Sequence, residues 1–311
     1  MNDIIGEPLS EFVLRSNLTE NENADAEEKL KQTEYTQPAM LTADLAIERL
    51  LNQHGIHPDM VAGHSLGEYA ALMVSGILRF EDALRAAAAR GTEMGSVEVP
   101  DKGIMASITA PYDVIESVLD SVNGYVIAAN KNSPNMTVIA GETEPMREAM
   151  QKFEEGGATV IQLQTSHAFH SRIVAPANEP LRRFLEGLEI SLPSIPITAN
   201  VDGSFYPDSV SDTEEVKDVI LEKLAPQMSS AVEWTSQVES MRDAGAKIYL
   251  EVGPKRALAL FAEQILDEEE CIVNITNHPK AGGITSFFGA LGMLAVAGRC
   301  PEIHLHSSEI H

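Results

Sequence analysis

The sequence predicts an α/β protein in which a larger, hydrolase-like domain with a mainly parallel sheet carries an inserted ferredoxin-like subdomain. The first observation is that apolar runs of strand length alternate with helical patterns on both sides of the insertion. The second is a run of six short elements within the insertion. The third is the segment 61–72, in which an apolar run ends in Gly-x-Ser-x-Gly and a helical pattern begins at once. We place the larger domain at 1–102 and 170–311 and the insertion at 103–169.

The first part of the chain is predicted to be mostly helical. Residues 17–31 are polar and acidic with few apolar anchors, which is typical of a mobile connection or an exposed helix. Pro38 is suited to the first turn of a helix, and apolar residues follow it at helical spacing. The elements expected here are a helix over 38–52, a short buried strand over 60–62, a helix after Ser65 that ends near residue 76, and a helix over 80–91.

The inserted subdomain is predicted from six elements in the order strand, helix, strand, strand, helix, strand, which is the ferredoxin-like arrangement. Its strands are expected over 104–108, 125–129, 136–140 and 159–163, with helices over 111–122 and 144–153. Alternation of strands and helices resumes after the insertion. There we expect helices over 181–185, 214–224 and 234–244 and strands over 195–200, 247–251 and 271–274.

Composition limits the partners of the protein. Its 311 residues carry 47 acidic and 22 basic side chains, a formal net charge of −25, which disfavours nucleic acid and anionic membranes. The longest apolar stretch, 284–298, is shorter than the roughly 20 residues of a membrane span. With two cysteines and no signal peptide, we expect a cytoplasmic protein. A polyanionic substrate would need a basic patch; the candidates, which are otherwise solvated charges on helix faces, are Arg85, Arg90, Lys131, Arg172, Arg182 and Arg183.

Ser65 lies in a segment typical of a nucleophile elbow, a sharp turn between a strand and a helix that exposes a serine. The flanking Gly63 and Gly67 are expected to let backbone pass where a Cβ would clash. The helix that begins at Leu66 aims free N–H groups at the serine, so Leu66 is a candidate oxyanion donor. This geometry suits acyl transfer, whereas a structural turn at a strand end would use the same residue types.

A serine nucleophile needs a base, and histidine is the usual one. His64 is adjacent to Ser65 on a turn and is expected to point away from it, so we assign it a structural role. His167 and His170 lie where the insertion returns to the larger domain, and clefts between domains are the usual place for ligands. Arg90 ends a predicted helix, where a cation is favourable.

Two stretches resemble the malonyl-CoA:acyl carrier protein transacylase family, which includes the acyltransferase domains of fatty acid and polyketide synthases. Gly-His-Ser-Leu-Gly-Glu-Tyr (63–69) is similar to the active-site segment of that family, and Ala-Phe-His-Ser (168–171) is similar to the segment that carries its general base. The resemblance implies that Ser65 is the nucleophile and His170 the general base. It also implies that Arg90 binds the free carboxylate of malonyl, for which a planar guanidinium offers two parallel hydrogen bonds.

Further site residues follow from the same resemblance. No Asp or Glu stands out to orient the histidine, and the segment 227–234 resembles the one whose first backbone carbonyl, that of Gln227, has this role. His-Ala-Phe-His is similar to the version associated with malonyl selection, in which Phe169 narrows the pocket beside the acyl α-carbon. The other residues assigned to the substrate pocket are Gln37, His64, Met94 and Asn132.

We therefore expect an acyltransferase that moves a malonyl group from malonyl-CoA, through a Ser65 ester, to the phosphopantetheine thiol of an acyl carrier protein, with no bound cofactor and no metal. The sequence lacks the strand and the Gly-Gln-Gly-Ser-Gln loop with which family members begin, so we interpret the chain as a piece of a multidomain synthase. Two alternatives stay open. A serine thioesterase or esterase would deliver the acyl group to water, and an inactive scaffold fragment would form no acyl-enzyme.

Overall fold

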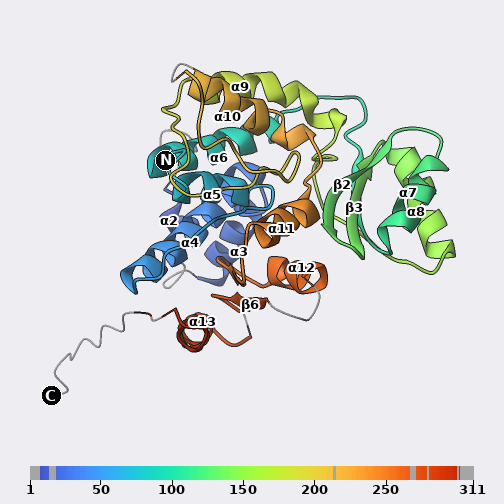
Figure 1. The fold of residues 1–311 in the computed structure, drawn as a ribbon. Helices are drawn as coiled ribbons and strands as arrows, with labels where there is room; N and C mark the ends of the chain where they lie inside the picture. Colours follow the sequence, from blue (N-terminus) through green and yellow to red (C-terminus); the bar gives the residue numbers. More distant parts are fainter. Residues whose placement is uncertain are drawn as a thin grey trace.

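The computed structural model describes residues 8–13, 19–212, 215–266, 271–278, 280–299 and 301 (Figure 1). A four-stranded antiparallel sheet with two helices forms one side of the molecule. A larger group of helices with a two-stranded parallel sheet forms the other side. The predicted α/β class is confirmed.

The four-stranded sheet has the predicted ferredoxin-like order. Its elements are β1 (Ile104–Thr109), α7 (Tyr112–Asp120), β2 (Val126–Ser133), β3 (Met136–Gly141), α8 (Thr143–Glu155) and β4 (Thr159–Gln162). The strands are arranged as β2-β3-β1-β4, and every pair of neighbours is antiparallel. The division into domains at residues 103 and 169 stays a prediction.

The two faces of this sheet have different partners. The face toward α7 and α8 is packed with the apolar side chains of Ile108, Ile115, Ile139, Met146 and Phe153. The opposite face presents Met105, Ala129, Val138 and Ala140. These side chains pack against Ala168 and Phe169, so the sheet supports the segment that contains His170.

Helices build the main core of the larger group. They are α4 (Thr33–Gln53), α5 (Gly67–Val74), α6 (Phe80–Gly95), α9 (Asn178–Glu186) and α10 (Val216–Leu224). Their buried side chains form one cluster, which includes Leu41, Tyr69, Leu72, Ala87, Leu181 and Leu221. This cluster supports α5, the helix that follows the predicted nucleophile.

Helix α4 begins five residues before the predicted start, so Pro38 lies inside it rather than in its first turn. The reason is its packing against α6. The hydroxyl of Thr33 donates to the carbonyl of Gly91 (3.0 Å), and a Cβ on Gly91 would lie 2.6 Å from the carbonyl oxygen of Thr33. The close approach of the two helices therefore holds the first turn of α4 in place.

Parallel pairing in the larger group is less extensive than predicted. Strand β5 (Ile248–Glu251) pairs with β6 (Ile272–Ile275), but the predicted strands over 60–62 and 195–200 meet only at a single parallel bridge between Val61 and Ile197. Beyond this bridge, Ala199 and Tyr206 form backbone hydrogen bonds around a second, antiparallel bridge between Thr198 and Phe205. The Asn200 N–H donates to the Glu68 carboxyl group instead of a neighbouring strand.

The remaining helices cover the edges of the larger group. They are α2 (Ser10–Val13), α3 (Glu20–Lys29), α11 (Trp234–Asp243), α12 (Ala257–Ile265) and α13 (Gly283–Val296), with 3₁₀ turns at Arg172–Ala177 and Gln227–Ser229. Helix α3 is largely exposed, as one of the two interpretations of 17–31 predicted, whereas α12 and α13 were not predicted. None of the helices in the described part of the chain has the length and apolar character needed to cross a bilayer.

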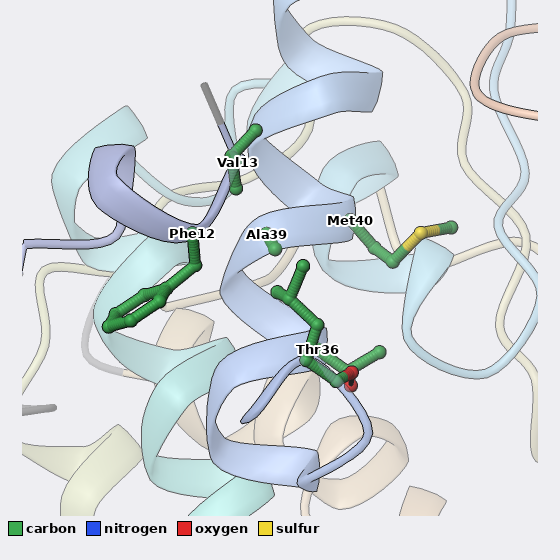
Figure 2. Close-up of a pocket in the computed structure, with 6 residues that line it drawn as sticks. Phe12, Val13, Thr36, Ala39 and Met40 are labelled. Atoms are coloured by element: carbon green, nitrogen blue, oxygen red, sulfur yellow. Dashed lines mark hydrogen bonds between the residues drawn. The ribbon is translucent and has the colours of Figure 1, made fainter. Parts of the chain in front are cut away.

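A cavity of about 290 Å³ lies between α2 and α4 (Figure 2). Its lining consists of Phe12, Val13, Leu30, Thr36, Ala39 and Met40. The one hydroxyl in this lining, that of Thr36, donates to the carbonyl of Leu30. The described residues of this lining therefore offer an apolar surface without a charged side chain.

Candidate active site

Ser65 lies in the turn that precedes α5. Its φ is 51°, in the left-handed region that a residue other than glycine rarely adopts. A Cβ on Gly63 would lie 2.0 Å from backbone atoms of Gly67, so the first glycine of the motif is required by this close approach. A Cβ on Gly67 would meet no atom within 4 Å. The prediction that both glycines avoid a clash is therefore wrong for the second one.

The hydroxyl of Ser65 lies against the imidazole of His170. Ser65 Oγ is 2.7 Å from His170 Nε2. On the other side of the ring, His170 Nδ1 is 3.2 Å from the carbonyl oxygen of Gln227 and 3.1 Å from that of Ser230. Because carbonyl oxygens only accept, Nδ1 carries the proton and Nε2 accepts the hydrogen bond from Ser65. Two backbone carbonyls thus orient the imidazole.

The surroundings of His170 keep its ring neutral. The residue is buried, and its backbone N–H donates to the carbonyl of Met228 at 2.9 Å, which holds a left-handed φ of 57°. Burial, the nearby guanidinium of Arg90 and the imidazole of His64 lower the pKa of His170 to about 3. A neutral imidazole near pH 7 is the form that removes a proton from a serine.

Arg90 projects from α6 into the same site and is buried. Its Nη2 donates to Ser65 Oγ at 3.0 Å, its Nη1 to Gln37 Oε1 at 2.9 Å and its Nε to Gln227 Oε1 at 3.1 Å. Burial lowers the pKa of Arg90, but a guanidinium stays protonated in proteins. The three hydrogen bonds go to neutral groups, so the site holds a cation whose hydrogen-bond partners carry no charge.

The two glutamines of the site extend this network. Gln37 Nε2 donates to Met94 Sδ at 3.6 Å, which places Met94 beside the arginine. Gln227 Nε2 donates to the backbone carbonyl of Ser65 at 2.6 Å. The sequence predicted a role only for the backbone carbonyl of Gln227, and its side chain also links Arg90 to the turn.

Asn200 and Glu68 belong to the site and were not predicted. Asn200 Oδ1 accepts from the backbone N–H of Ser65 at 2.7 Å, and Asn200 Nδ2 donates to the carbonyl of Gly63 at 2.7 Å. Glu68 Oε1 accepts from the N–H of Asn200 (3.1 Å) and from the hydroxyl of Tyr206 (2.8 Å). For Asn200 the one available signal was a polar residue at the end of a predicted strand, whereas Glu68 lies in the segment 63–69 that carries Ser65.

The backbone N–H of Leu66 has no acceptor among the described residues. The backbone N–H of Ser65, by contrast, is engaged by Asn200. Leu66 lies at the start of α5, where the helix dipole favours negative charge. Of the two amides at the turn, that of Leu66 is therefore the one free to bind an oxyanion.

His64 lies on the side of the turn that faces the insertion. Its Nε2 is 2.7 Å from Asn132 Oδ1, an acceptor, so His64 donates to β2. Its ring meets that of Trp234 edge to face, with the centroids 5.6 Å apart.

Two further residues of the segment 167–170 are placed by packing. Phe169 packs on the core of the larger group and on the sheet of the insertion. His167 is buried, and its Nε2 lies 2.9 Å from the carbonyl of Val97.

The basic residues of the predicted patch are mostly paired with carboxylates. Five of the six residues of the predicted basic patch have acidic partners, in the pairs Arg85–Asp82, Lys131–Glu233, Arg172–Glu142, Arg182–Glu186 and Arg183–Glu179. Arg90 is the exception, because it bonds neutral groups. No group of three or more His, Cys, Asp or Glu side chains within the described residues is arranged to hold a metal ion.

Comparisons of sequence and of structure both match this chain to acyl transferases. Residues 7–290 match the acyl transferase domain family. Over 259 residues the chain is 35% identical to the malonyl CoA-acyl carrier protein transacylase of Escherichia coli O157:H7, which covers 82% of this chain and 81% of that protein.

Two further matches involve polyketide synthesis. The chain is 32% identical over 289 residues to the polyketide biosynthesis protein ThaF of Burkholderia thailandensis. That match covers 92% of this chain and 23% of ThaF, so the chain spans less than a quarter of this relative. A chain from the complex of a type II polyketide synthase acyl-carrier protein with its malonyl-transacylase superposes with a TM-score of 0.77 at 31% identity, covering 93% of this chain and 88% of that one.

Proposed function

The chain belongs to the acyl transferase domain family, and from this we propose that it moves a malonyl group from malonyl-CoA, through an ester on Ser65, to the phosphopantetheine thiol of an acyl carrier protein. One observation carries the proposal. Ser65 Oγ lies 2.7 Å from a neutral imidazole and 3.0 Å from a buried guanidinium. The first contact suits a nucleophile, and the second suits an acyl group that ends in a carboxylate.

The first half-reaction forms the malonyl ester. His170 Nε2 takes the proton of Ser65, and Oγ attacks the thioester carbonyl. The backbone N–H of Leu66 binds the oxyanion of the tetrahedral intermediate. When the intermediate collapses, the C–S bond breaks, and His170 returns the proton to the thiolate of CoA. The carbonyls of Gln227 and Ser230 hold Nδ1–H throughout, and they favour the imidazolium that forms transiently.

The second half-reaction reverses these steps with a different thiol. His170 takes the proton of the phosphopantetheine thiol, whose sulfur attacks the Ser65 ester. Collapse breaks the bond between the acyl carbon and Oγ, and His170 protonates Ser65. The carrier protein leaves as its malonyl thioester, and the enzyme returns to its starting state. The names of the relatives support an acyl carrier protein as the acceptor.

Arg90 is proposed to bind the free carboxylate of the malonyl group. An incoming carboxylate replaces neutral partners of the guanidinium with a charged one, which strengthens the hydrogen bonds. Gln37 and Gln227 fix the orientation of Arg90, and Met94 lies behind Gln37. The proposed walls of the acyl pocket are Phe169 and the paired His64 and Asn132.

Intact mass spectrometry after brief mixing with malonyl-CoA tests the proposal. We expect a malonyl adduct on the wild-type protein and none on Ser65→Ala, because only the hydroxyl of Ser65 can carry the ester. Release of CoA without an adduct would instead indicate a thioesterase. A folded wild-type protein that forms no adduct and releases no CoA would be an inactive scaffold, and the proposal would be wrong.

A further inference from the structure

We propose that Asn200 is a positioning residue that holds the turn around Ser65 in its reactive conformation, with Glu68 and Tyr206 holding Asn200. This inference rests on the proposed function only in that Ser65 is taken as the nucleophile. Asn200 and Glu68 are both fully buried and touch no reacting atom. Both side-chain hydrogen bonds of Asn200 go to the turn. Its N–H donates to Glu68, which also accepts from the Tyr206 hydroxyl.

The amide of Asn200 binds the turn on both sides of the serine. Its Oδ1 accepts from the Ser65 N–H, and its Nδ2 donates to the Gly63 carbonyl, each at 2.7 Å. An asparagine can do both because one planar group carries an acceptor and a donor. Ser65 has a φ of 51°, which a serine in an unsupported chain seldom adopts. The two hydrogen bonds supply the external support that this conformation needs.

Glu68 closes a ring between the turn and the segment that carries Asn200. It lies in the first turn of α5, and its own N–H donates to the Ser65 carbonyl at 3.2 Å. Its Oε1 accepts from the Asn200 N–H and from the Tyr206 hydroxyl. Burial raises the pKa of Glu68 to about 7, so the neutral acid is readily populated and needs no cationic partner. The ring therefore connects α5, the turn and Asn200.

The same ring determines which amide faces the substrate. Asn200 engages the Ser65 N–H, and Gln227 Nε2 donates to the Ser65 carbonyl at 2.6 Å. In a trans peptide the C=O and the following N–H point in opposite directions. Fixing the Ser65 carbonyl toward Gln227 thus turns the Leu66 N–H away from Gln227 and leaves it free. Without Asn200, we expect the serine and this amide to lose their common orientation.

A fluorophosphonate probe tests the inference independently of the acyl substrate. This reagent phosphonylates an activated serine with loss of fluoride, so its rate reports how well Ser65 and His170 are aligned. We expect Asn200→Ala to slow the reaction about tenfold or more, because small displacements of reacting groups are costly. Asn200→Asp keeps the shape and the acceptor but loses the donor to Gly63, and we expect it to be slowed about tenfold as well.

Thr198→Val is the matched control. Thr198 is buried in the same segment and donates to Gln237 Oε1 at 3.0 Å, away from the turn. This variant loses one buried hydrogen bond without touching Ser65, so we expect its rate to stay within about twofold of wild type. If Thr198→Val and the Asn200 variants lose rate equally, the effect is a general loosening of the segment, and the inference is overturned.

Glu68 offers a test by conservative rescue. Glu68→Leu removes the acceptor for the Asn200 N–H and should slow the probe, whereas Glu68→Gln keeps that acceptor and should recover most of the lost rate. A purely space-filling role would not separate these two variants. Thermal melts of each protein show whether it is folded. If Asn200→Ala does not fold, the rate of Asn200→Asp with the probe is the test. A folded Asn200 variant that reacts at the wild-type rate overturns the inference.

Failure of the proposed function gives a different result. A wild-type protein that reacts rapidly with the fluorophosphonate but forms no malonyl adduct would contradict malonyl transfer and leave the positioning test valid. A wild-type protein that does not react with the probe has no activated serine, which would overturn both proposals.

Discussion

Ser65 Oγ makes two hydrogen bonds with opposite roles. It donates to His170 Nε2 and accepts from Arg90 Nη2. The guanidinium lies so close to the imidazole that it also lowers the pKa of His170. Burial has the larger effect on the pKa of His170, and the cation adds to it. The same cation is expected to attract the carboxylate of the acyl group. Replacing Arg90 tests its role in the selectivity for malonyl, and titrating His170 tests whether its ring stays neutral.

Replacing Arg90 by alanine should shift acyl selectivity from malonyl toward acetyl. A hydrogen bond to a charged group contributes about 1.5–3 kcal/mol, so we expect the malonyl-to-acetyl ratio to fall about tenfold or more. The measurement is competition between equal concentrations of malonyl-CoA and acetyl-CoA, with the acyl-enzymes separated by mass. Arg182→Ala, which breaks an exposed ion pair with Glu186, serves as the control. Unchanged selectivity in Arg90→Ala would show that another group binds the carboxylate.

His170 should remain neutral far below the ordinary pKa of histidine. Its ring loses the neutral form only as the pH falls toward about 3. Unfolded chains bind this proton near pH 6.5, so between pH 6.5 and 3 the unfolded state holds more protons. This residue therefore lowers the free energy of unfolding as the pH falls through that window. An NMR titration of histidine-labelled protein measures the pH at which the ring becomes charged. The signal of His170 is assigned by its absence in His170→Gln. A His170 signal that titrates near pH 6.5 would contradict the expected burial.

At the scale of the turn and its helix, the two glycines of Gly-x-Ser-x-Gly should respond differently to alanine. Gly63→Ala places a Cβ 2.0 Å from the backbone of Gly67, and overpacking of this kind costs about 1–3 kcal/mol or displaces the turn. Gly67→Ala meets nothing and replaces a glycine in the first turn of α5, so we expect equal or greater stability. Denaturant unfolding and the rate of malonyl adduct formation measure both variants. Equal losses in the two variants would disprove this distinction.

Elements with local patterns were predicted well from the sequence. The six elements of the insertion each carry their own periodicity, and the turn residues between them are local too, so their order was confirmed. The segments near Val61 and Ile197 were predicted as strands from the same kind of apolar run. They pair at one bridge only, because Glu68 binds the backbone of Asn200 where a ladder would continue. A side chain on another element decided this outcome.

The residues of the candidate site likewise fall into those that a local motif predicted and those that it did not. Ser65 and His170 were predicted because each lies in a short motif, and the structure brings their side chains within 2.7 Å. Asn200 lies in no motif, and 135 residues separate it from the serine whose N–H it binds. The second carbonyl at His170, that of Ser230, depends on the course of a 3₁₀ turn at Gln227–Ser229. Contacts of this kind depend on how distant segments pack together, and no local sequence pattern predicts them.

For the whole molecule, the distribution of charge is the dominant electrostatic feature. The 47 acidic side chains exceed the 22 basic ones by 25, so at least 25 carboxylates have no basic partner of their own. Helix α7 shows the pattern locally. Glu116 and Asp120 are both exposed and lie four residues apart on one face, where like charges repel. Neither has a basic partner in the described part of the chain. The folded state brings such charges closer together than the unfolded chain does.

Sodium chloride should therefore raise the melting temperature. The Debye length falls from about 10 Å at 0.1 M to about 3 Å at 1 M, which screens repulsion across the whole surface. The exposed ion pairs weaken too, but each contributes little, so we expect a net rise of at least about 2 °C. Calorimetry from 0.05 to 1 M NaCl measures it. The variant Glu116→Gln with Asp120→Asn should melt higher at low salt and gain less from added salt, because it has lost one repulsive pair. A melting temperature that falls with salt would mean that attraction between paired surface charges outweighs repulsion among the unpaired carboxylates.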